Sequence, residues 1–300
     1  MRRFSALGSA SVGIALVLAL HACGSSGAST TNPAPVDGAV TVEDGDIIEP
    51  DGAVTKPDTA KPSKVKATEE TVTLGSGATR GYVLSVPKTY DANRKYPLVL
   101  ALHGDGQTAS GFRLFLGLDD ISGDDAIVAY PDQSLDLFTP YDQNEDQLML
   151  EAIINAVKGK LSIDPAKVWG LGYSKGAFMV NEIACRKPGL LKAIAAHATG
   201  APQEPRGADG YPICPGVVGL PVMTSEGDRD TEIGADYAAQ YWASVNACTT
   251  NRQPSTPSVC EKYVGCEAGK PVVFCLAPGV SHYPIWADAA QVSWDFFKTL

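Results

Sequence analysis

The sequence predicts an α/β domain with a mostly parallel central sheet and helices on both faces. Apolar runs long enough for strands alternate with segments of helical periodicity from about residue 70 onward, and this alternation is typical of a parallel sheet. Some of the runs are apolar at nearly every position, as in strands that are covered on both faces. Residues 68–300 are numerous enough for a single domain of this kind.

The composition is that of an acidic globular protein. Hydrophobic residues make up 44% of the 300 residues and charged residues 19%, which is ordinary for a folded chain. The formal net charge is −10. Because nothing supplies a basic face for phosphates, we expect no nucleic-acid partner.

Residues 1–22 predict a signal peptide. Two arginines, at positions 2 and 3, precede an apolar run over 12–20 that is too short to span a bilayer comfortably. Leu20-His21-Ala22-Cys23 then resembles the bacterial lipobox, in which the cysteine is lipidated. We therefore expect an exported protein that a lipid on Cys23 anchors to a bacterial membrane, with a plain secretory signal as the alternative.

Residues 23–67 predict a disordered tether. They are rich in Pro, Thr and Asp and contain no aromatic residue. Such a composition cannot bury enough apolar surface to offset its chain entropy. We interpret the segment as a flexible spacer and residues 68–300 as the folded domain.

The first half of the domain predicts four strands and a helix. Residues 71–74 and 80–87 are expected to form antiparallel strands around a Gly-Ser-Gly turn. The apolar runs 96–102 and 126–130 predict buried strands. Apolar residues at helical spacing predict an amphipathic helix over 147–160.

The second half continues the alternation of strands and helices. In chain order we expect a strand from Val168, a helix over 177–185, strands over 192–197 and 220–224, a helix over 233–245, a hairpin over 259–276 and a helix over 289–298.

The pattern Gly172-x-Ser174-x-Gly176 lies between the Val168 strand and the helix that follows it. This is the nucleophile-elbow motif, in which a serine lies on a strained turn between a strand and a helix. Glycines flank the serine because close packing there leaves no room for a Cβ. We interpret Ser174 as a nucleophile; a Gly-Ser turn that fits the pattern by chance is the alternative.

A serine nucleophile requires a general base, and His282 is the best candidate. His282 lies in a loop after the predicted hairpin, and in one class of serine hydrolases the histidine comes last in the chain. The other histidines are His21 in the signal, His103 before the elbow, and His197 in an Ala-rich strand, which we interpret as structural.

The orienting carboxylate should follow a strand between the serine and His282. Asp228 and Asp230 both do so. The spacing Gly227-x-x-Asp230-x-x-Ile233 is close to a pattern common at this place in such enzymes, and it favours Asp230, while Asp228 stays open. With the acid in place, the histidine would take the serine's proton as it attacks an ester carbonyl, and an acyl-enzyme would form.

The oxyanion of that reaction requires two backbone N–H donors. One should come from Lys175, directly after the serine, and the other from the Gly-rich loop 103–106, where we nominate the N–H of Asp105. His103 is expected to anchor this loop and is also a candidate for substrate contact. We expect no cofactor and no metal: no His/Cys spacing resembles a zinc set, and the aspartates at 119–120 and 124–125 are expected to be solvated loop charges.

Five motifs resemble, in order and spacing, the esterases of carbohydrate esterase family one and the polyhydroxybutyrate depolymerases. They are Leu102-His103-Gly104, Tyr130-Pro131-Asp132-Gln133, Ile163-Asp164-Pro165, Gly172-Tyr173-Ser174-Lys175-Gly176-Ala177 and Gly279-x-x-His282-x-Pro284. The resemblance covers roughly residues 70–298 and implies an α/β-hydrolase fold and a serine esterase of the feruloyl or acetylxylan type. Two positions depart from the family pattern: Glu226 stands where histidine is frequent, and Lys175 where small or amide residues are common.

The resemblance leaves the substrate open. Feruloyl or acetylxylan esters are the leading choice and polyhydroxybutyrate the second, because no substrate-binding module for a solid polymer is appended. A peptidase is more remote, and a non-catalytic hydrolase-like binding lipoprotein is disfavoured by the intact Ser, Asp and His. Recognition of an aryl or polyester group would require aromatic residues, although aromatics are also ordinary core residues. The candidates are Phe138, Tyr141, Tyr173, Tyr283 and Trp286.

Six cysteines besides Cys23 predict three disulfides in an exported protein. The resemblance implies a bond between Cys185 and Cys214. The remaining four cysteines allow three connectivities. The expected hairpin turn places Cys260 opposite Cys275, which leaves Cys248 with Cys266.

Overall fold

The structure is a computed structural model that describes residues 47–48, 54–55, 63–134, 143–231 and 234–300. The chain divides into two compact units, residues 1–59 and 60–300. In the first unit, strands β1 (Ile47–Ile48) and β2 (Val54–Thr55) pair antiparallel. The predicted signal peptide and Cys23 lie outside the described residues. In the part of the chain that is described, no helix has the length and apolarity needed to cross a membrane.

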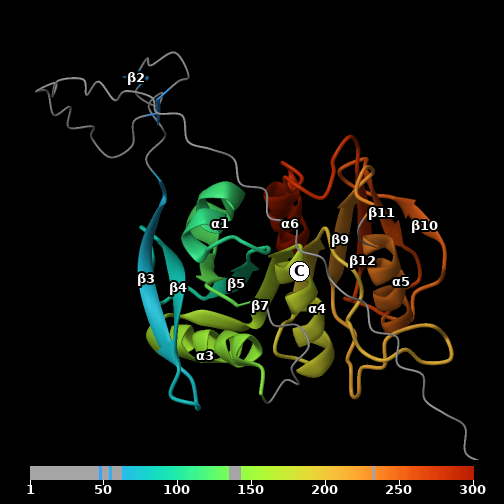
Figure 1. Ribbon diagram of the computed structural model, residues 1–300, viewed down its shortest axis with the longest axis horizontal. Coiled ribbons are helices and arrows are strands. Elements are labelled where there is room, and N and C mark those ends of the chain that lie inside the picture. Colours follow the sequence, from blue (N-terminus) through green and yellow to red (C-terminus); the bar gives the residue numbers. More distant parts are fainter. Residues whose placement is uncertain (1–46, 49–53, 56–62, 135–142, 232–233) are drawn as a thin grey trace, which may run out of the picture. The chain divides into compact units, whose positions relative to one another are not determined.

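Within the described residues of the second unit, ten strands form one sheet in the order β10-β11-β12-β9-β8-β7-β5-β6-β4-β3 (Figure 1). The middle of the sheet, from β6 through β12, is parallel, and β3, β4, β10 and β11 add antiparallel edges. The strands are β3 (Val65–Thr73), β4 (Thr79–Pro87), β5 (Tyr96–Leu102), β6 (Ile127–Pro131), β7 (Ile163–Tyr173), β8 (Ala193–His197), β9 (Val222–Gly227), β10 (Arg252–Pro254), β11 (Cys260–Tyr263) and β12 (Val272–Ala277).

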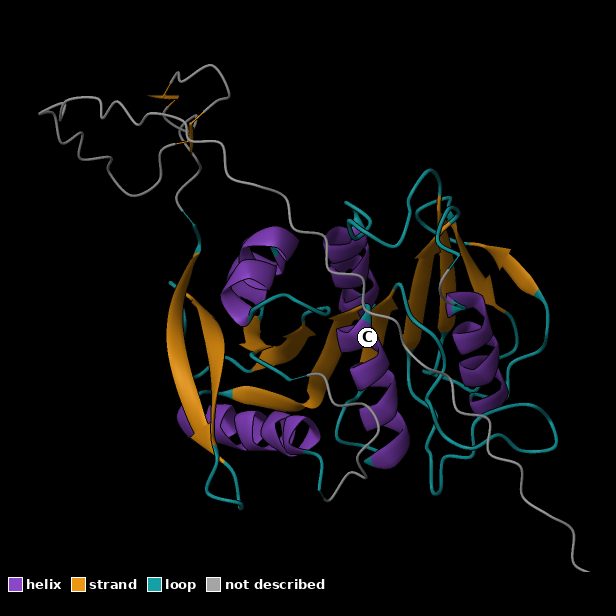
Figure 2. Ribbon diagram, viewed as in Figure 1, coloured by secondary structure: helices purple, strands orange, loops and turns teal. Residues whose placement is uncertain are grey.

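Helices cover both faces of this sheet (Figure 2). On one face α3, α4 and α5 share a core with the sheet, and on the other α1, α2 and α6 do so. The helices are α1 (Ala109–Leu116), α2 (Leu118–Ser122), α3 (Glu145–Lys160), α4 (Lys175–Arg186), α5 (Ala235–Val245) and α6 (Ala289–Lys298), with a 3₁₀ turn at Gly123–Asp125. The predicted fold class is therefore confirmed.

The structure adds elements that the sequence analysis did not predict. The strand predicted over 71–74 belongs to β3, which begins at Val65, inside the segment predicted as tether, and pairs with β4 along its whole length. Most of its side chains are polar and only two are buried, so main-chain pairing to a neighbour, rather than an apolar pattern, extends the strand. Helix α1 had a readable signal in the apolar spacing of Ala109, Phe112 and Leu116 and in its N-cap, Thr108, whose hydroxyl accepts from Gly111 N–H.

The parallel strands position the candidate site. Loops after the carboxyl ends of β5, β7, β9 and β12 contain the predicted oxyanion loop, Ser174, Asp230 and His282. Together with β8, which lies between β7 and β9, these strands pair in parallel. Their carboxyl ends therefore lie at one edge of the sheet, where ligands bind in open α/β folds.

Candidate active site

Ser174 lies on a strained turn between β7 and α4, with φ 52° and ψ −124°. The glycines on either side make the turn possible. A Cβ on Gly172 would lie 2.4 Å from the carbonyl oxygen of Gly176, and a Cβ on Gly176 would lie 2.3 Å from that of Leu102. The start of α4 thus packs against main chain at the end of β5, which brings the serine beside the loop after β5.

Ser174, His282 and Asp230 form a hydrogen-bonded line. Ser174 Oγ lies 2.9 Å from His282 Nε2, and His282 Nδ1 lies 2.8 Å from Asp230 Oδ2. The Asp230 side chain is fully buried, whereas His282 is 25% exposed. A histidine protonated on Nδ1 would donate to the aspartate and accept from the serine hydroxyl, as general-base catalysis requires.

Of the two candidate acids, only one contacts the histidine in the described residues. Asp228 is exposed and accepts a 2.7 Å hydrogen bond from the Gly279 N–H. This bond ties the loop after β9 to the loop that carries His282. Asp228 therefore shapes the loop, and Asp230 faces the histidine.

Tyr173 connects the elbow to the histidine loop. Its hydroxyl donates to the main-chain oxygen of His282 at 2.5 Å, and its ring would lie 3.0 Å from a Cβ on Gly104. The side chain is only 3% exposed. These contacts and its burial make Tyr173 a support for the loops around Ser174, and its contact with a substrate stays a prediction.

His103 anchors the loop after β5, as expected. Its Nε2 accepts from the Gln133 N–H at 3.3 Å, and its carbonyl oxygen accepts from Gln133 Nε2 at 2.9 Å. Because the ring is 2% exposed, little of it is accessible, and contact between His103 and a substrate stays a prediction.

The two residues nominated as oxyanion donors are linked through their side chains. Lys175 Nζ lies 2.7 Å from Asp105 Oδ2, and both side chains are exposed. The hydrogen bond from Lys175 lowers the pKa of the Asp105 carboxyl. Within the described residues, neither the Asp105 nor the Lys175 N–H donates to a protein acceptor, so both are available to a ligand.

The remaining aromatic candidates have different positions. Tyr283 follows His282 and is 67% exposed. Trp286 is partly buried and packs against the core beneath α6. Phe138 and Tyr141 lie outside the described residues. Tyr283 is thus the candidate most accessible to a substrate.

Two polar residues near the site have structural roles. His197 is buried between the hydroxyls of Ser225 and Ser293, at 2.6 and 2.7 Å, and burial lowers the pKa of its ring to about 4, so it is neutral at pH 7. Glu226, which departs from the family pattern, accepts from the Ala235 N–H at 2.8 Å and caps α5. Burial raises the pKa of Glu226.

Two cavities of very different size lie at opposite ends of the parallel strands. A cavity behind His282, lined by Ile285 and Trp286, holds only about 10 Å³, which is about the limit for one water molecule. A much larger one, about 870 Å³, lies around Lys167 and Lys270, at the amino ends of the parallel strands.

No group of three or more His, Cys, Asp and Glu is placed to hold a metal ion in the residues that the structure describes. One of the acidic pairs differs from the expectation of solvated charges. Asp119 is 1% exposed and accepts from Ser85 Oγ at 2.7 Å and from Arg113 Nε at 2.6 Å. Asp119 and Arg113 thus form an ion pair that, together with Ser85, joins α1, α2 and β4.

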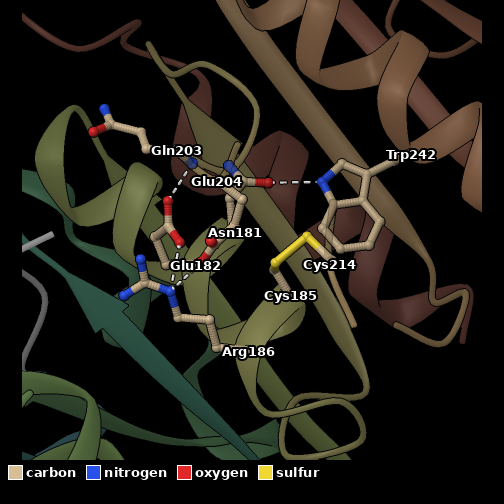
Figure 3. The surroundings of a disulfide bond; sticks show 8 residues. All are labelled: Asn181, Glu182, Cys185, Arg186, Gln203, Glu204, Cys214 and Trp242. Carbon is tan, nitrogen blue, oxygen red and sulfur yellow. Dashed lines mark hydrogen bonds and ion pairs between the residues drawn. A yellow bond between two sulfur atoms is a disulfide. The ribbon is translucent and has the colours of Figure 1, made fainter. Parts of the chain in front are cut away.

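The structure contains the three disulfides that the sequence analysis expected: Cys185–Cys214, Cys248–Cys266 and Cys260–Cys275. The first ties the elbow helix α4 to the loop before β9 (Figure 3). Cys260 and Cys275 are opposite each other in the β11–β12 pairing. Two of the bonds thus brace the segments that lead to Asp230 and His282.

No family model matches the chain. Among curated proteins it is 24% identical to feruloyl esterase B of Piromyces equi, over 73% of this chain and 45% of that protein. It is 26% identical to the probable feruloyl esterase C of Aspergillus terreus, over 73% of this chain and 83% of that protein. A shorter match, 32% identical, joins 38% of this chain to 30% of the poly(3-hydroxyalkanoate) depolymerase C of Paucimonas lemoignei. The chain thus spans less than half of the first relative and most of the second.

Solved structures of esterases share the fold. A ferulic acid esterase from Anaeromyces mucronatus superposes with a TM-score of 0.55 at 18% identity, over 82% of this chain and 93% of that one. An acetyl xylan esterase from Aspergillus awamori gives 0.57 at 17% identity, over 78% of this chain and all of that one. The chain has the α/β-hydrolase fold and is homologous to carboxylic ester hydrolases.

Proposed function

We propose that this chain is an exported serine esterase in which Ser174 is the nucleophile, His282 the general base and Asp230 the residue that orients the imidazole. The main support for this proposal is the pair of contacts from Ser174 Oγ to His282 Nε2, at 2.9 Å, and from His282 Nδ1 to Asp230 Oδ2, at 2.8 Å. A nucleophile within hydrogen-bonding reach of a base that a third group orients is the arrangement that acyl transfer requires.

In the proposed reaction, Ser174 Oγ attacks the ester carbonyl carbon while its proton passes to His282 Nε2. The backbone N–H groups of Asp105 and Lys175 stabilise the oxyanion. The C–O bond to the alcohol breaks, and the alcohol leaves with the proton from His282. Water, deprotonated by the same histidine, then attacks the acyl-enzyme, which releases the carboxylic acid and restores the serine.

The proposed substrates are feruloyl or acetyl esters of plant cell-wall polysaccharides. Support comes from relatives and structural neighbours named feruloyl esterase and acetyl xylan esterase. A polyhydroxybutyrate substrate is the second candidate, because the depolymerase relative matches at higher identity but over a shorter segment. A non-catalytic binding role is disfavoured by the contacts among Ser174, His282 and Asp230.

Export and lipid anchoring are part of the proposal. Three disulfides support an oxidising compartment, and the lipobox-like sequence supports lipidation of Cys23, which lies outside the described residues. In a bacterial host, the wild type should fractionate with membranes and carry lipid, and Cys23→Ser should not. Equal fractionation of both forms without lipid would refute the anchor and leave the esterase proposal untouched.

Activity should be measured on the disulfide-bonded domain with methyl ferulate, p-nitrophenyl acetate and hydroxybutyrate oligomers. We expect Ser174→Ala to lose hydrolysis of every ester that the wild type cleaves, because no nucleophile remains. Ser258→Ala, which changes an exposed serine in the loop before β11, is the matched control. No turnover by a folded wild type would defeat the enzyme proposal. Turnover of the hydroxybutyrate oligomers but not of methyl ferulate would make polyhydroxybutyrate, instead of feruloyl esters, the proposed substrate.

A further inference from the structure

Two exposed aromatic rings face each other beside the proposed active site. Phe115 is 44% exposed and Tyr283 is 67% exposed. Their centroids lie 6.4 Å apart, and their planes differ by only 9°. Within the described residues these are the only aromatic side chains in the exposed class. The exposed aromatic surface of the described residues is therefore concentrated at this one place.

One member of the pair lies next to the proposed base in the chain. Tyr283 follows His282, so their Cα atoms are about 3.8 Å apart. The loop is held by the Tyr173 hydroxyl on the His282 oxygen, at 2.5 Å, and by the Ser281 hydroxyl on the Tyr283 oxygen, at 3.1 Å. The position of the Tyr283 main chain is thus coupled to that of the base.

Phe115 stands on a helix that is fixed next to the predicted oxyanion loop. Helix α1 begins three residues after Gly106, with Thr108 as its N-cap. Phe112 is fully buried and Leu116 is 7% exposed, so these two side chains anchor the helix on the core. Leu114, the residue before Phe115, is also exposed, at 77%.

We propose that Phe115 and Tyr283 form an aromatic platform that binds the phenolic ring of the substrate's acyl group, which makes Phe115 a specificity-determining residue. This inference rests on the proposed esterase function. Aromatic rings gain stacking energy beyond their area burial, equivalent to roughly 3- to 10-fold in affinity per pair. An acetyl group offers no ring, so the platform favours esters of aromatic acids over acetyl esters.

The two side chains of the proposed platform take no part in the bond changes. Stacking on a ring that takes no part in the bond changes is equally strong in the bound substrate and in the transition state. Its loss should therefore raise KM and change kcat little. A general disturbance of the active site would instead lower kcat for every ester.

The test compares Phe115→Leu, which keeps apolar volume without a ring, with Phe115→Tyr, which keeps the ring. Three esters separate the possible roles: methyl ferulate has an aromatic acyl group, benzyl acetate an aromatic alcohol, and triacetin no ring. Ile213→Ala, which shortens an exposed apolar side chain outside the pair (52% exposed), is the control. Melting curves establish that each variant is folded.

We expect Phe115→Leu to lower kcat/KM for methyl ferulate by about 3- to 10-fold, through a higher KM, and to change kcat/KM for triacetin by less than about twofold. Phe115→Tyr should have the wild-type kcat/KM for methyl ferulate. Equal losses on all three esters, no loss on methyl ferulate, or a loss confined to benzyl acetate would each overturn the platform. If the wild type hydrolyses none of the esters, the proposed function itself fails. The two failures are therefore distinguishable.

Discussion

Glu182 on α4 should make the stability of this protein depend strongly on pH (Figure 3). Its side chain is fully buried, and burial raises the pKa of its carboxyl from 4.5 to about 7. The Gln203 N–H donates to it, and Arg186 Nε lies 3.2 Å from its second oxygen. That oxygen has no aligned hydrogen bond within the described residues, and Arg186 also bonds Glu204 at 2.5 Å. Desolvation therefore outweighs the nearby positive charge.

The raised pKa determines the sign of the effect. Between pH 4.5 and 7 the folded protein keeps a proton that the unfolded chain releases. The contribution to stability is therefore fully present below pH 4.5 and is lost as the pH rises through about 7. The difference between the two pKa values corresponds to about 3 kcal/mol. Glu182→Gln cannot ionise, so relative to the wild type the variant should gain about 3 kcal/mol in its free energy of unfolding between pH 4 and pH 8.

Urea denaturation of both proteins at several values from pH 4 to pH 8, followed by tryptophan fluorescence with the disulfides intact, gives this difference directly. Other titrating groups affect both proteins equally and cancel. Glu204→Gln is the matched control, because it removes a carboxylate from the same arginine but leaves Glu182 in place, so it should keep most of the wild-type pH dependence. If the difference between Glu182→Gln and wild type is constant across the range, the reasoning from burial is refuted.

Two further predictions concern the elbow and its neighbours. Gly176→Ala places a Cβ 2.3 Å from a main-chain oxygen, so it should lower the free energy of unfolding by about 1–3 kcal/mol and abolish most p-nitrophenyl acetate turnover. Gly159→Ala, in α3 with open space around it, should be neutral or stabilising. Equal melting temperatures and activities of the two variants would contradict the clash. The ion pair of Lys175 and Asp105 joins the two proposed oxyanion donors. Because salt screens this exposed pair, raising NaCl to about 1 M should lower wild-type turnover, by no more than about fivefold. Lys175→Met should already show the lower turnover at low salt and should have no salt dependence. The same salt dependence in both proteins would show that the pair does not order the donors.

Local signals were enough to predict most of the sheet and the chemistry. Strand β5 is apolar at nearly every position because it is covered on both faces, and the bounds predicted for the last helix are those of α6. The Gly172-x-Ser174-x-Gly176 spacing encodes a steric requirement that the structure displays directly. Such features depend on neighbours in the chain, so they are readable without a fold.

Other features depend on residues distant in sequence. Strand β3 has little apolar pattern and forms because β4 offers its main chain. The spacing of the sequence favoured Asp230 but left Asp228 open, because the turn after β9 directs one to Gly279 and the other to His282. Phe115 could not be connected to the site, because its partner ring lies more than one hundred and fifty residues further along the chain.

The sequence by itself determined the fold class, the serine on its strained turn and the histidine that follows the last strand, because each is a local pattern or a matter of chain order. Tertiary structure decided between the two carboxylates that the sequence left open, and it alone decided which aromatic rings are buried, as that of Tyr173 is, or exposed, as that of Tyr283 is. The physical reason is that burial and side-chain contacts are properties of the packed chain. Residues brought together by parallel strands at one edge of a sheet share no signal in the sequence that joins them.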